Sequence, residues 1–327
     1  AGTAPLEWKG DLAARMVDGA HRFLDGEIAG TLKERSFGSR AELARILGVT
    51  ADVRVTEARF EYTEPAPGPV GEGGFTARRV RWRAVGEIHG AGVLLEPVGE
   101  VWADVLALPE AGQEPVEICG IEIAGAEPTT TAFAAKLAAL GCRVLVPLLV
   151  NREGGITARE QLHRPAWQLG RTLTAYELHV LHAGVSALRA LPATRTQKTG
   201  VVGWGEGGRL ALYFAALEES VGAALVSGYF GPRSRVWDEP ADRTVFGLLR
   251  GHRDAAIAAL IAPGKMIVEH GHYPRFGYRL DEAGAPQLLD RPAGSGGKPG
   301  KLLSFTAEEV ETEIRLSGGG HAAFGLD

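Results

Sequence analysis

The sequence feature that most constrains the fold is a glycine-rich turn that joins an apolar strand to a helix. The strand is expected at Thr199 to Trp204 and the helix at Gly208 to Leu217. Four of the six residues from 203 to 208 are glycines, and glycine allows both positive φ angles and close contact between backbones. An apolar strand that leads directly into a helix is typical of a parallel sheet covered by helices on both faces.

Antiparallel strands are expected ahead of this turn. Between residues 75 and 85, Arg79, Arg81 and Arg83 alternate with apolar residues, which predicts a half-buried strand with one solvated face. The predicted early strands are Val53–Tyr62, Phe75–Val85, Ala91–Pro97 and Val101–Pro109.

From residue 129 onward, apolar strands alternate with helical segments. The further strands are expected at Cys142–Val150, Ala223–Tyr229, Lys265–Glu269 and Ile314–Ser317. The helices are expected at Thr129–Leu140, Leu169–Leu191 and Ala255–Leu260. A stretch rich in glycine, proline and charge, from Arg275 to Gly300, is predicted to be a surface excursion.

Two helices are expected before the first strand. One runs from Asp11 to about Ile28, and a shorter one covers Ala41 to Leu47, with Ser39 as its N-cap and Gly48 as a stop signal. We therefore expect an N-terminal helical extension at residues 1–50 and one domain at residues 51–327. The predicted fold class is α/β, with a mostly parallel sheet and helices on both faces.

Composition and charge narrow the class of protein. Apolar residues make up 45% of the chain and charged residues 23%, as in globular proteins. The longest apolar runs, such as Val144 to Val150, are far shorter than the ~20 residues needed to cross a bilayer. A net charge of −5 leaves no basic footprint, so neither nucleic acid nor a membrane is an expected partner. Cys119 and Cys142 lie in apolar surroundings, which predicts buried, unreactive thiols.

The turn has a recognisable frame. Gly203-Trp204-Gly205-Glu206-Gly207 has the spacing of the G-x-S-x-G nucleophile elbow, with Gly205 at its centre. A strand ends ahead of the turn Glu110–Gly112, and His321 follows three glycines near the end of the chain. On these residues, the stretch from Val93 to Phe324 resembles α/β-hydrolases, above all the dienelactone hydrolase and acetyl xylan esterase branch.

A second resemblance concerns the parent protein. The Gly-x-Gly-Glu-Gly-Gly turn and the stretch Ser227 to Gly231 are similar to those of a group of long bacterial hydrolase-like proteins. This resemblance implies export and a longer parent chain.

The hydrolase resemblance implies where a catalytic triad would lie. It places Gly205 at the nucleophile position and His321 as the general base. The acid of the family follows the seventh strand as G-x-x-D, and this spacing falls on Pro274 here. Glu269 and Asp281 are the nearby candidates for the acid.

The resemblance also implies an oxyanion hole. The backbone amides of Glu206 and of Ala111 or Gly112 would form it. Trp204 and Tyr229, near strand ends, would line an apolar pocket, and packing in the core is the equally good alternative.

Glycine at position 205 leaves no side chain to attack an ester carbonyl. Loss of a serine nucleophile costs on the order of a million-fold in turnover, so we expect poor or absent hydrolysis of small-molecule or carbohydrate esters. The glycine is either natural or an engineered replacement. A binding or structural protein that uses the hydrolase scaffold is the alternative function. A third alternative gives the chemistry to Glu206, whose simpler role is that of a carboxylate at a helix N-terminus.

Two pairs of histidines have spacings that could suit a metal. His179 and His182 are three apart on a predicted helix, and His270 and His272 are two apart after a strand. A zinc site needs at least three protein ligands, and neither pair has a third. We therefore expect packing or surface histidines and no metal.

The turn also fits a dinucleotide fingerprint. Gly203, Gly205 and Gly208 match G-x-G-x-x-G after a strand. The turn comes late in the chain, however, and no acidic residue ends the following strand at Ala224 to Ser227. No cofactor is expected.

The ends of the chain suggest two further expectations. Only residues 322–327 follow His321, too few for the helix that closes the sheet in this family, so an uncovered sheet face would favour self-association. At Ala1 there is no initiator Met, so either a signal peptide has been removed or the sequence was cut from a longer one. An exported location is favoured over a cytoplasmic one.

Overall fold

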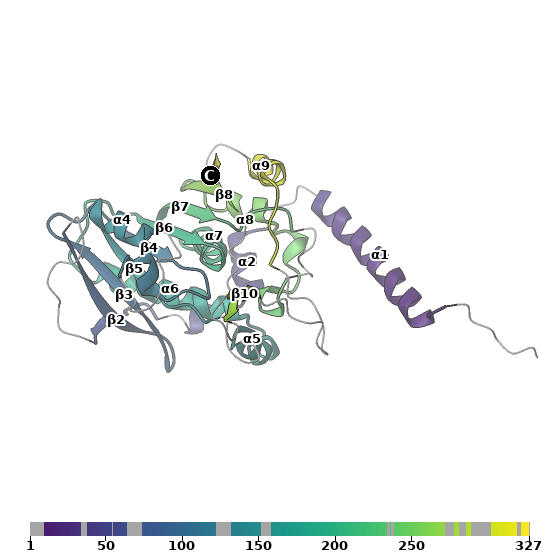
Figure 1. The fold of residues 1–327 in the computed structure, drawn as a ribbon, viewed down its shortest axis with the longest axis horizontal. Coiled ribbons are helices and arrows are strands. Elements are labelled where there is room, and N and C mark those ends of the chain that lie inside the picture. The colour runs from purple at the N-terminus through teal and green to yellow at the C-terminus, as the bar shows by residue number, and fades with distance from the viewer. Residues whose placement is uncertain are drawn as a thin grey trace, which may run out of the picture.

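The computed structural model describes residues 10–33, 38–53, 55–63, 74–121, 132–151, 158–233, 236, 239–271, 278–280, 286–288, 302–318 and 322–326. Statements about structure refer to these residues. They form a layered body around one large sheet, and the first helix projects from it (Figure 1).

Nine described strands make up the large sheet, in the order β1-β2-β3-β5-β4-β6-β7-β8-β11 (Figure 1). The strand pairs from β1 to β5 are antiparallel, and those from β5 to β11 are parallel. The bounds are β1 Glu61–Tyr62, β2 Phe75–Val85, β3 Ile88–Pro97, β4 Ala103–Leu108, β5 Cys142–Pro147, β6 Thr199–Trp204, β7 Val221–Ser227, β8 Lys265–His270 and β11 Ala322–Leu326. The predicted fold class, α/β with a mostly parallel sheet, is confirmed.

Helices pack on both faces of the sheet. The larger core lies under α2 (Arg40–Leu47), α6 (Leu173–Arg189), α7 (Glu206–Leu217), α8 (Asp254–Ala259) and α9 (Ala307–Leu316). The smaller core, on the opposite face, lies under α3 (Pro115–Ile118) and α4 (Phe133–Ala139). The remaining elements are α1 (Leu12–Lys33), α5 (Ala158–Gln168), the 3-10 turns Ala51–Val53, η3 (Ala241–Arg243) and η4 (Leu248–Arg250), and a small hairpin of β9 (Tyr278–Leu280) and β10 (Pro286–Leu288).

Strand β2 and helix α2 show how local sequence determines these elements. In β2, Val80, Trp82 and Ala84 are buried while the three alternating arginines are exposed, as the pattern predicts. In α2, the Ser39 side chain accepts a hydrogen bond from the amide of Glu42, and Gly48 ends the helix with a φ of 84°. Both predicted caps are confirmed.

Two predicted strands are wrong. Of the described residues in Val53–Tyr62, Glu61 and Tyr62 alone form a strand. The residues Ile314–Ser317 belong to α9 and its C-cap. Helix α9 begins with a capping box in which Thr306 and Glu309 satisfy each other's backbone amides, a start signal that outweighs the short apolar run. The last strand is therefore β11, which comes after residue 321.

The sheet face opposite α7 and α8 is only partly covered. Ala223 on β7 is exposed, Ile267 on β8 is 47% exposed, and Val202 and Leu225 are half-buried. Whether a closing helix is missing here, and whether this face favours self-association, stay predictions. Within the described parts of the chain, none of the helices combines the length and hydropathy that a bilayer crossing requires.

Candidate functional site

The turn at residue 205 has the sharp geometry of an elbow. Gly205 has φ 60° and ψ −115°, and α7 begins at the next residue. Its amide donates a hydrogen bond of 3.0 Å to the carbonyl of Ser227 on the neighbouring strand β7. Side chains other than hydrogen are strained at such a φ, so glycine here is the residue of lowest backbone strain.

The flanking glycines allow strand and helix to touch through their backbones. A Cβ on Gly203 would lie 2.1 Å from the carbonyl oxygen of Gly207, and one on Gly207 would lie 2.2 Å from the carbonyl oxygen of Leu108. Gly208 approaches the Ser227 carbonyl in the same way, at 2.6 Å. All three glycines are therefore accounted for by backbone packing of β6 and α7 against β4 and β7.

The amide that follows the elbow position is already engaged. In hydrolases with this elbow, the backbone N–H after the nucleophile stabilises the oxyanion. Here the amide of Glu206 donates a short hydrogen bond to the side-chain carboxylate of Glu110. Both residues are buried, at 0% and 1% exposed. A carboxylate of the protein thus occupies the hydrogen-bonding position that an oxyanion would need.

The loop after β4 holds Glu110 in place. The amide of Glu110 donates to the side-chain oxygen of Gln113, and the amide of Gln113 donates to the carbonyl of Glu110. Ala111 is buried and Gly112 half-buried in the same loop. The loop lies beside the elbow, as predicted, but its contact with the Glu206 amide comes from the Glu110 side chain. Whether Ala111 or Gly112 could donate a second hydrogen bond stays a prediction.

The carboxylate of Glu206 points into a group of arginines. One oxygen accepts from Arg209 at 2.6 Å and from Arg159 at 3.3 Å, and the other accepts from Arg243 at 2.6 and 2.9 Å. Because three guanidinium groups surround this fully buried carboxylate, it is not presented to solvent as a nucleophile or base. Its position in the first turn of α7 fits the simpler role predicted for it, and the arginines are its main partners.

Glu206 is the centre of a larger ionic network, here called the elbow charge cluster. Its members are charged side chains no more than 5% exposed, namely Arg159, Glu177, Glu206, Arg209, Arg233, Glu239, Asp242, Arg243 and Asp254. Arg159 bridges Glu177 and Asp242, and Arg243 bridges Glu206 and Glu239. The cluster therefore connects α7 with α5, α6, η3, α8 and the residues just before η3.

Tyr229 packs against two arginines of this cluster. It is 5% exposed, and the guanidinium carbons of Arg233 and Arg243 lie 4.4 and 5.5 Å from its ring centroid. Burial raises the pKa of its hydroxyl well above the ordinary value. Trp204, at the end of β6, is half-buried. The arrangement supports core packing for Tyr229, with one side at a small pocket.

The predicted acid lies at the same edge of the sheet as the elbow. Trp204, Ser227 and Glu269 are register partners on three adjacent parallel strands, so Glu269 is two strands away from the elbow. It is half-buried. Asp281 lies outside the described residues, so its role as an alternative acid stays a prediction.

The predicted base also lies outside the described residues. His321 was expected to follow the last strand, but β11 starts at Ala322, after this histidine. Ala322 pairs with Met266 near the start of β8, while Leu326 pairs with His270 at its end. The expected order of strand and histidine is therefore wrong, and the role of His321 stays a prediction.

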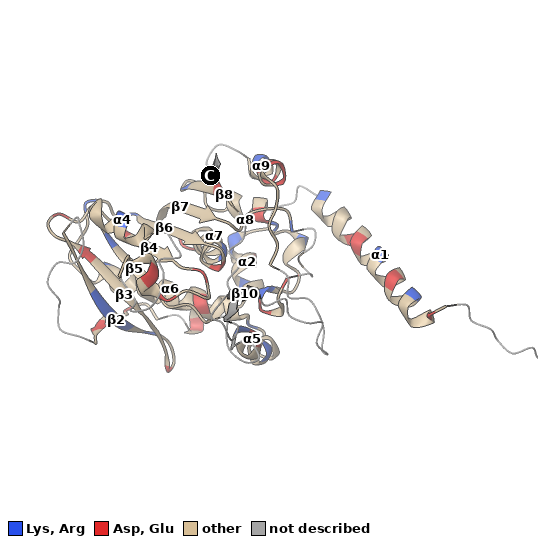
Figure 2. Cartoon of the chain, viewed as in Figure 1, with Lys and Arg blue, Asp and Glu red and all other residues tan. Residues whose placement is uncertain are grey.

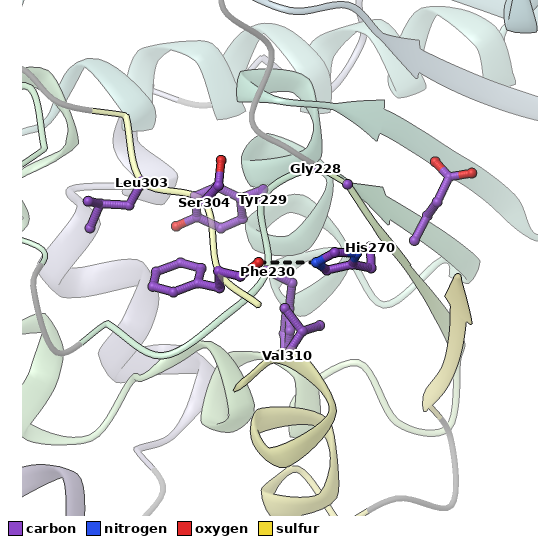
Figure 3. Close-up of a pocket in the computed structure, with 10 residues that line it drawn as sticks. Gly228, Tyr229, Phe230, His270, Leu303, Ser304 and Val310 are labelled. Atoms are coloured by element: carbon purple, nitrogen blue, oxygen red, sulfur yellow. Dashed lines mark hydrogen bonds between the residues drawn. The ribbon is translucent and has the colours of Figure 1, made fainter. Parts of the chain in front are cut away.

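A small pocket opens near the ends of β7 and β8 (Figure 3). Tyr229, Glu269, His270 and Ser304 are among its lining residues, and its volume is about 10 Å³, enough for about one water molecule. The ring nitrogen Nε2 of His270 lies 3.1 Å from the carbonyl of Phe305, as the dashed line shows (Figure 3). This pocket does not have the volume for an ester substrate.

The remaining histidines and cysteines have structural partners or surroundings. His182 contacts Glu218 through Nδ1 at 3.1 Å and packs against Phe214. Across the described parts of the chain, no group of three or more His, Cys, Asp or Glu residues is placed to hold a metal, and His272 lies outside them. Cys119 is buried, as expected, and burial raises the pKa of its thiol to about 12, whereas Cys142 is only half-buried.

Sequence reasoning missed Glu110 and the elbow charge cluster. The chain has 35 lysines and arginines, and only 7 of them are lysines. Arginine is preferred over lysine in buried ion pairs, so the excess of arginine was the signal that could have suggested such a cluster.

Comparisons with known proteins agree with this geometry. Residues 103–260 match the model of the dienelactone hydrolase family. A Bacteroides fragilis protein provisionally described as an acetyl xylan esterase aligns with 94% of this chain and 82% of its own, with a TM-score of 0.62 and 11% identity. Acetyl xylan esterase 1 from Thermoanaerobacterium sp. JW/SL YS485 aligns with 91% of this chain and 90% of its own, with a TM-score of 0.52 and 13% identity.

At such identities the structural likeness shows the fold alone, and no curated protein matches the chain in sequence. The family match, the sheet topology and the elbow all indicate an α/β-hydrolase fold. The chain has the α/β-hydrolase fold, and its residues 103–260 match the model of the dienelactone hydrolase family.

Proposed function

We propose that this chain is a non-hydrolytic member of its branch, a protein in which the hydrolase fold serves as a structural or binding scaffold. The observation that carries the proposal is the hydrogen bond from the Glu206 amide to the Glu110 carboxylate. In a hydrolase that amide must be free to bind the oxyanion of the tetrahedral intermediate. A negative carboxylate in its place would both occupy the donor and repel the developing charge.

Two further features support the proposal. Gly205 has no side chain to form a covalent intermediate with an acyl group. In addition, the carboxylate beside it, that of Glu206, is buried among Arg159, Arg209 and Arg243. The elbow is thus surrounded by side chains that satisfy one another, which is an arrangement suited to stability.

Hydrolysis of a short-chain aryl ester tests the proposal. We expect the unmodified chain and the Gly205→Ser variant both to show no turnover above the buffer rate, because the restored hydroxyl would still face an occupied oxyanion position. Gly205→Ala is the matched control, since it introduces the same backbone strain of about 1–3 kcal/mol without a hydroxyl. Circular dichroism would establish that each variant is folded.

Two results would overturn the proposal. One is saturable turnover by the unmodified chain. The other is a gain of at least ~10³-fold in Gly205→Ser over Gly205→Ala, which is within what a restored nucleophile can supply. In the second case, loss of the gain in a further His321→Ala variant would show that the triad implied by the family is assembled.

A further inference from the structure

Among the residues that the structure describes, the apolar face of helix α1 has no partner. It is 22 residues long, and none of its residues is buried. Met16, Val17, Phe23 and Leu24 are between 53% and 69% exposed, and Leu12 is 40% exposed. The helix projects from the body (Figure 1), which it contacts near η4 and through a hydrogen bond from Arg253 to the carbonyl of Leu32.

Such a helix is a poor candidate for independent stability. Most helical stability in proteins comes from packing of an amphipathic face, and α1 contains Gly19, Gly26 and Gly30, each of which weakens a helix relative to alanine. Its large apolar side chains together expose on the order of 500 Å², the size of patch that marks interaction sites on soluble proteins. The helix therefore needs a surface on which to bury this face.

The order of apolar residues in α1 is symmetric about Ala20. Residues 3, 4 and 8 positions before it are Val17, Met16 and Leu12, and those at the same distances after it are Phe23, Leu24 and Ile28. Two copies of the helix that pack antiparallel, with both Ala20 residues at the crossing point, bring large apolar side chains together at every one of these positions. A small residue at the crossing allows close approach, and a two-fold axis requires this kind of self-complementary pattern.

The charges of α1 obey the same symmetry. The two-fold rotation that places Met16 of one copy opposite Leu24 of the other also places Arg15 opposite Asp25 and Asp18 opposite Arg22. These side chains lie on the outer faces of such a pair, where opposite signs avoid like-charge repulsion. Figure 2 shows the alternation of acidic and basic residues along the helix. Helices that lie on membranes are instead rich in lysine and arginine, whereas residues 12–33 contain three basic and three acidic side chains.

We propose that the apolar face of α1 binds a second copy of this chain, through an antiparallel α1–α1 pair centred on Ala20. Two such faces would bury about 1,000 Å² in total, the lower limit for a specific interface. The proposal does not depend on the proposed function, because α1 is distant in sequence from the elbow and none of its residues contributes to the elbow charge cluster.

Sedimentation equilibrium of the full 327-residue chain tests whether the pair forms. We expect a dimer at micromolar concentration and a dissociation constant at least tenfold weaker in Leu24→Asp, because a charge would lie in the centre of the contact. Arg22→Ala, on the outer face of the same helix, is the matched control and should stay dimeric. A chain that remains monomeric at every concentration would overturn the proposal, as would a monomer that binds phosphatidylcholine–phosphatidylserine vesicles through α1.

Cross-linking tests the register. In a Cys142→Ala background, which removes the half-buried native thiol, a Met16→Cys chain mixed with a Leu24→Cys chain should form mixed disulfide dimers on mild oxidation. Met16→Cys alone should not cross-link, since the two copies of residue 16 would be about 12 Å apart along the helix axis, beyond the reach of a disulfide. Self-linked Met16→Cys dimers without mixed dimers would contradict the antiparallel register.

Discussion

The glycine turn and the elbow charge cluster meet at Glu206. The turn has the backbone geometry of a hydrolase elbow, and the cluster surrounds it with ion pairs. The turn keeps the backbone: Gly205 has the positive φ of the elbow, and Gly203 and Gly207 allow the strand and helix to touch. The side chains around the turn are different. Glu110 accepts a hydrogen bond from the backbone amide of Glu206, and three arginines bind the Glu206 carboxylate. Backbone geometry and side-chain chemistry can therefore change independently at the same turn.

We expect the cluster to contribute to the stability of the chain. Buried ion pairs are costly to form, since both charges lose their hydration, and removal of one partner leaves the others unpaired. The cluster therefore should be more sensitive to substitution than the turn.

The largest effect is expected from Glu206→Gln. Loss of one charge at the centre of the cluster leaves Arg159, Arg209 and Arg243 without their shared carboxylate, so we expect the free energy of unfolding to fall by about 3–5 kcal/mol. Chemical denaturation measures it. The control is Glu219→Gln, whose side chain is 81% exposed beside Arg40 and which should change stability by no more than about 0.5 kcal/mol. Equal effects of the two substitutions would show that the cluster has no special role.

A smaller effect is expected at the turn itself. A methyl group on Gly207 would meet the Leu108 carbonyl oxygen at 2.2 Å, so Gly207→Ala should lower stability by about 1–3 kcal/mol through overpacking. Gly200→Ala on the same strand–helix unit is the comparison, because its methyl group would have 3.3 Å to the nearest side-chain atom. Thermal unfolding distinguishes them. If Gly200→Ala destabilised the chain as much, the close packing of the elbow would not explain its glycines.

The last comparison concerns pH and contrasts two buried carboxylates. Burial raises the pKa of Asp254 to about 7, in spite of the charge of Arg233. Burial alone would also raise the pKa of Glu218, but hydrogen bonds from His182 and Ser220 and the charges of His182 and Arg189 hold it well below the ordinary value of 4.5. The two groups therefore have opposite effects on the pH dependence of stability.

For Asp254, the stabilising contribution is complete below its ordinary pKa of 3.8 and is lost as the pH rises through about 7. The free energy of unfolding of Asp254→Asn, relative to that of the unmodified chain, should therefore be higher above pH 7 than near pH 4. For Glu218, the contribution is present above 4.5 and is lost as the pH falls, so the cost of Glu218→Gln should shrink in acid. Urea denaturation across this range measures both, and parallel pH profiles for the two variants would contradict the assignment.

The parts of the fold that could be predicted from sequence are those that depend on neighbouring residues. The alternation of Arg79, Val80, Arg81 and Trp82 predicts β2, and the spacing of Gly203, Gly205 and Gly207 predicts the elbow, because each pattern acts within a few residues. The prediction of a strand at Ile314–Ser317 was wrong because a capping box at Thr306 and Glu309 starts a helix there.

The contacts that change the site could not be predicted in this way. Glu110 and Glu206 are 96 residues apart, and Arg159 and Asp242 are 83 apart. Nothing local in the sequence distinguishes Glu110 from an exposed acidic residue at a turn, or Arg159 from a surface arginine on a polar helix. Only the fold brings these residues together. The sequence therefore predicted that the Glu206 amide would be available to an oxyanion and did not predict its hydrogen bond to Glu110.

The hydrogen bond between the Glu206 amide and the Glu110 carboxylate is the central claim, and the amide proton reports on it directly. In amide-resolved NMR spectra, we expect the Glu206 amide proton to resonate downfield and to move upfield in Glu110→Ala. The exposed Glu114, four residues further along the same loop, serves as the control, and Glu114→Ala should leave the resonance in place. A Glu206 amide resonance that is the same with and without the Glu110 carboxylate would contradict the account.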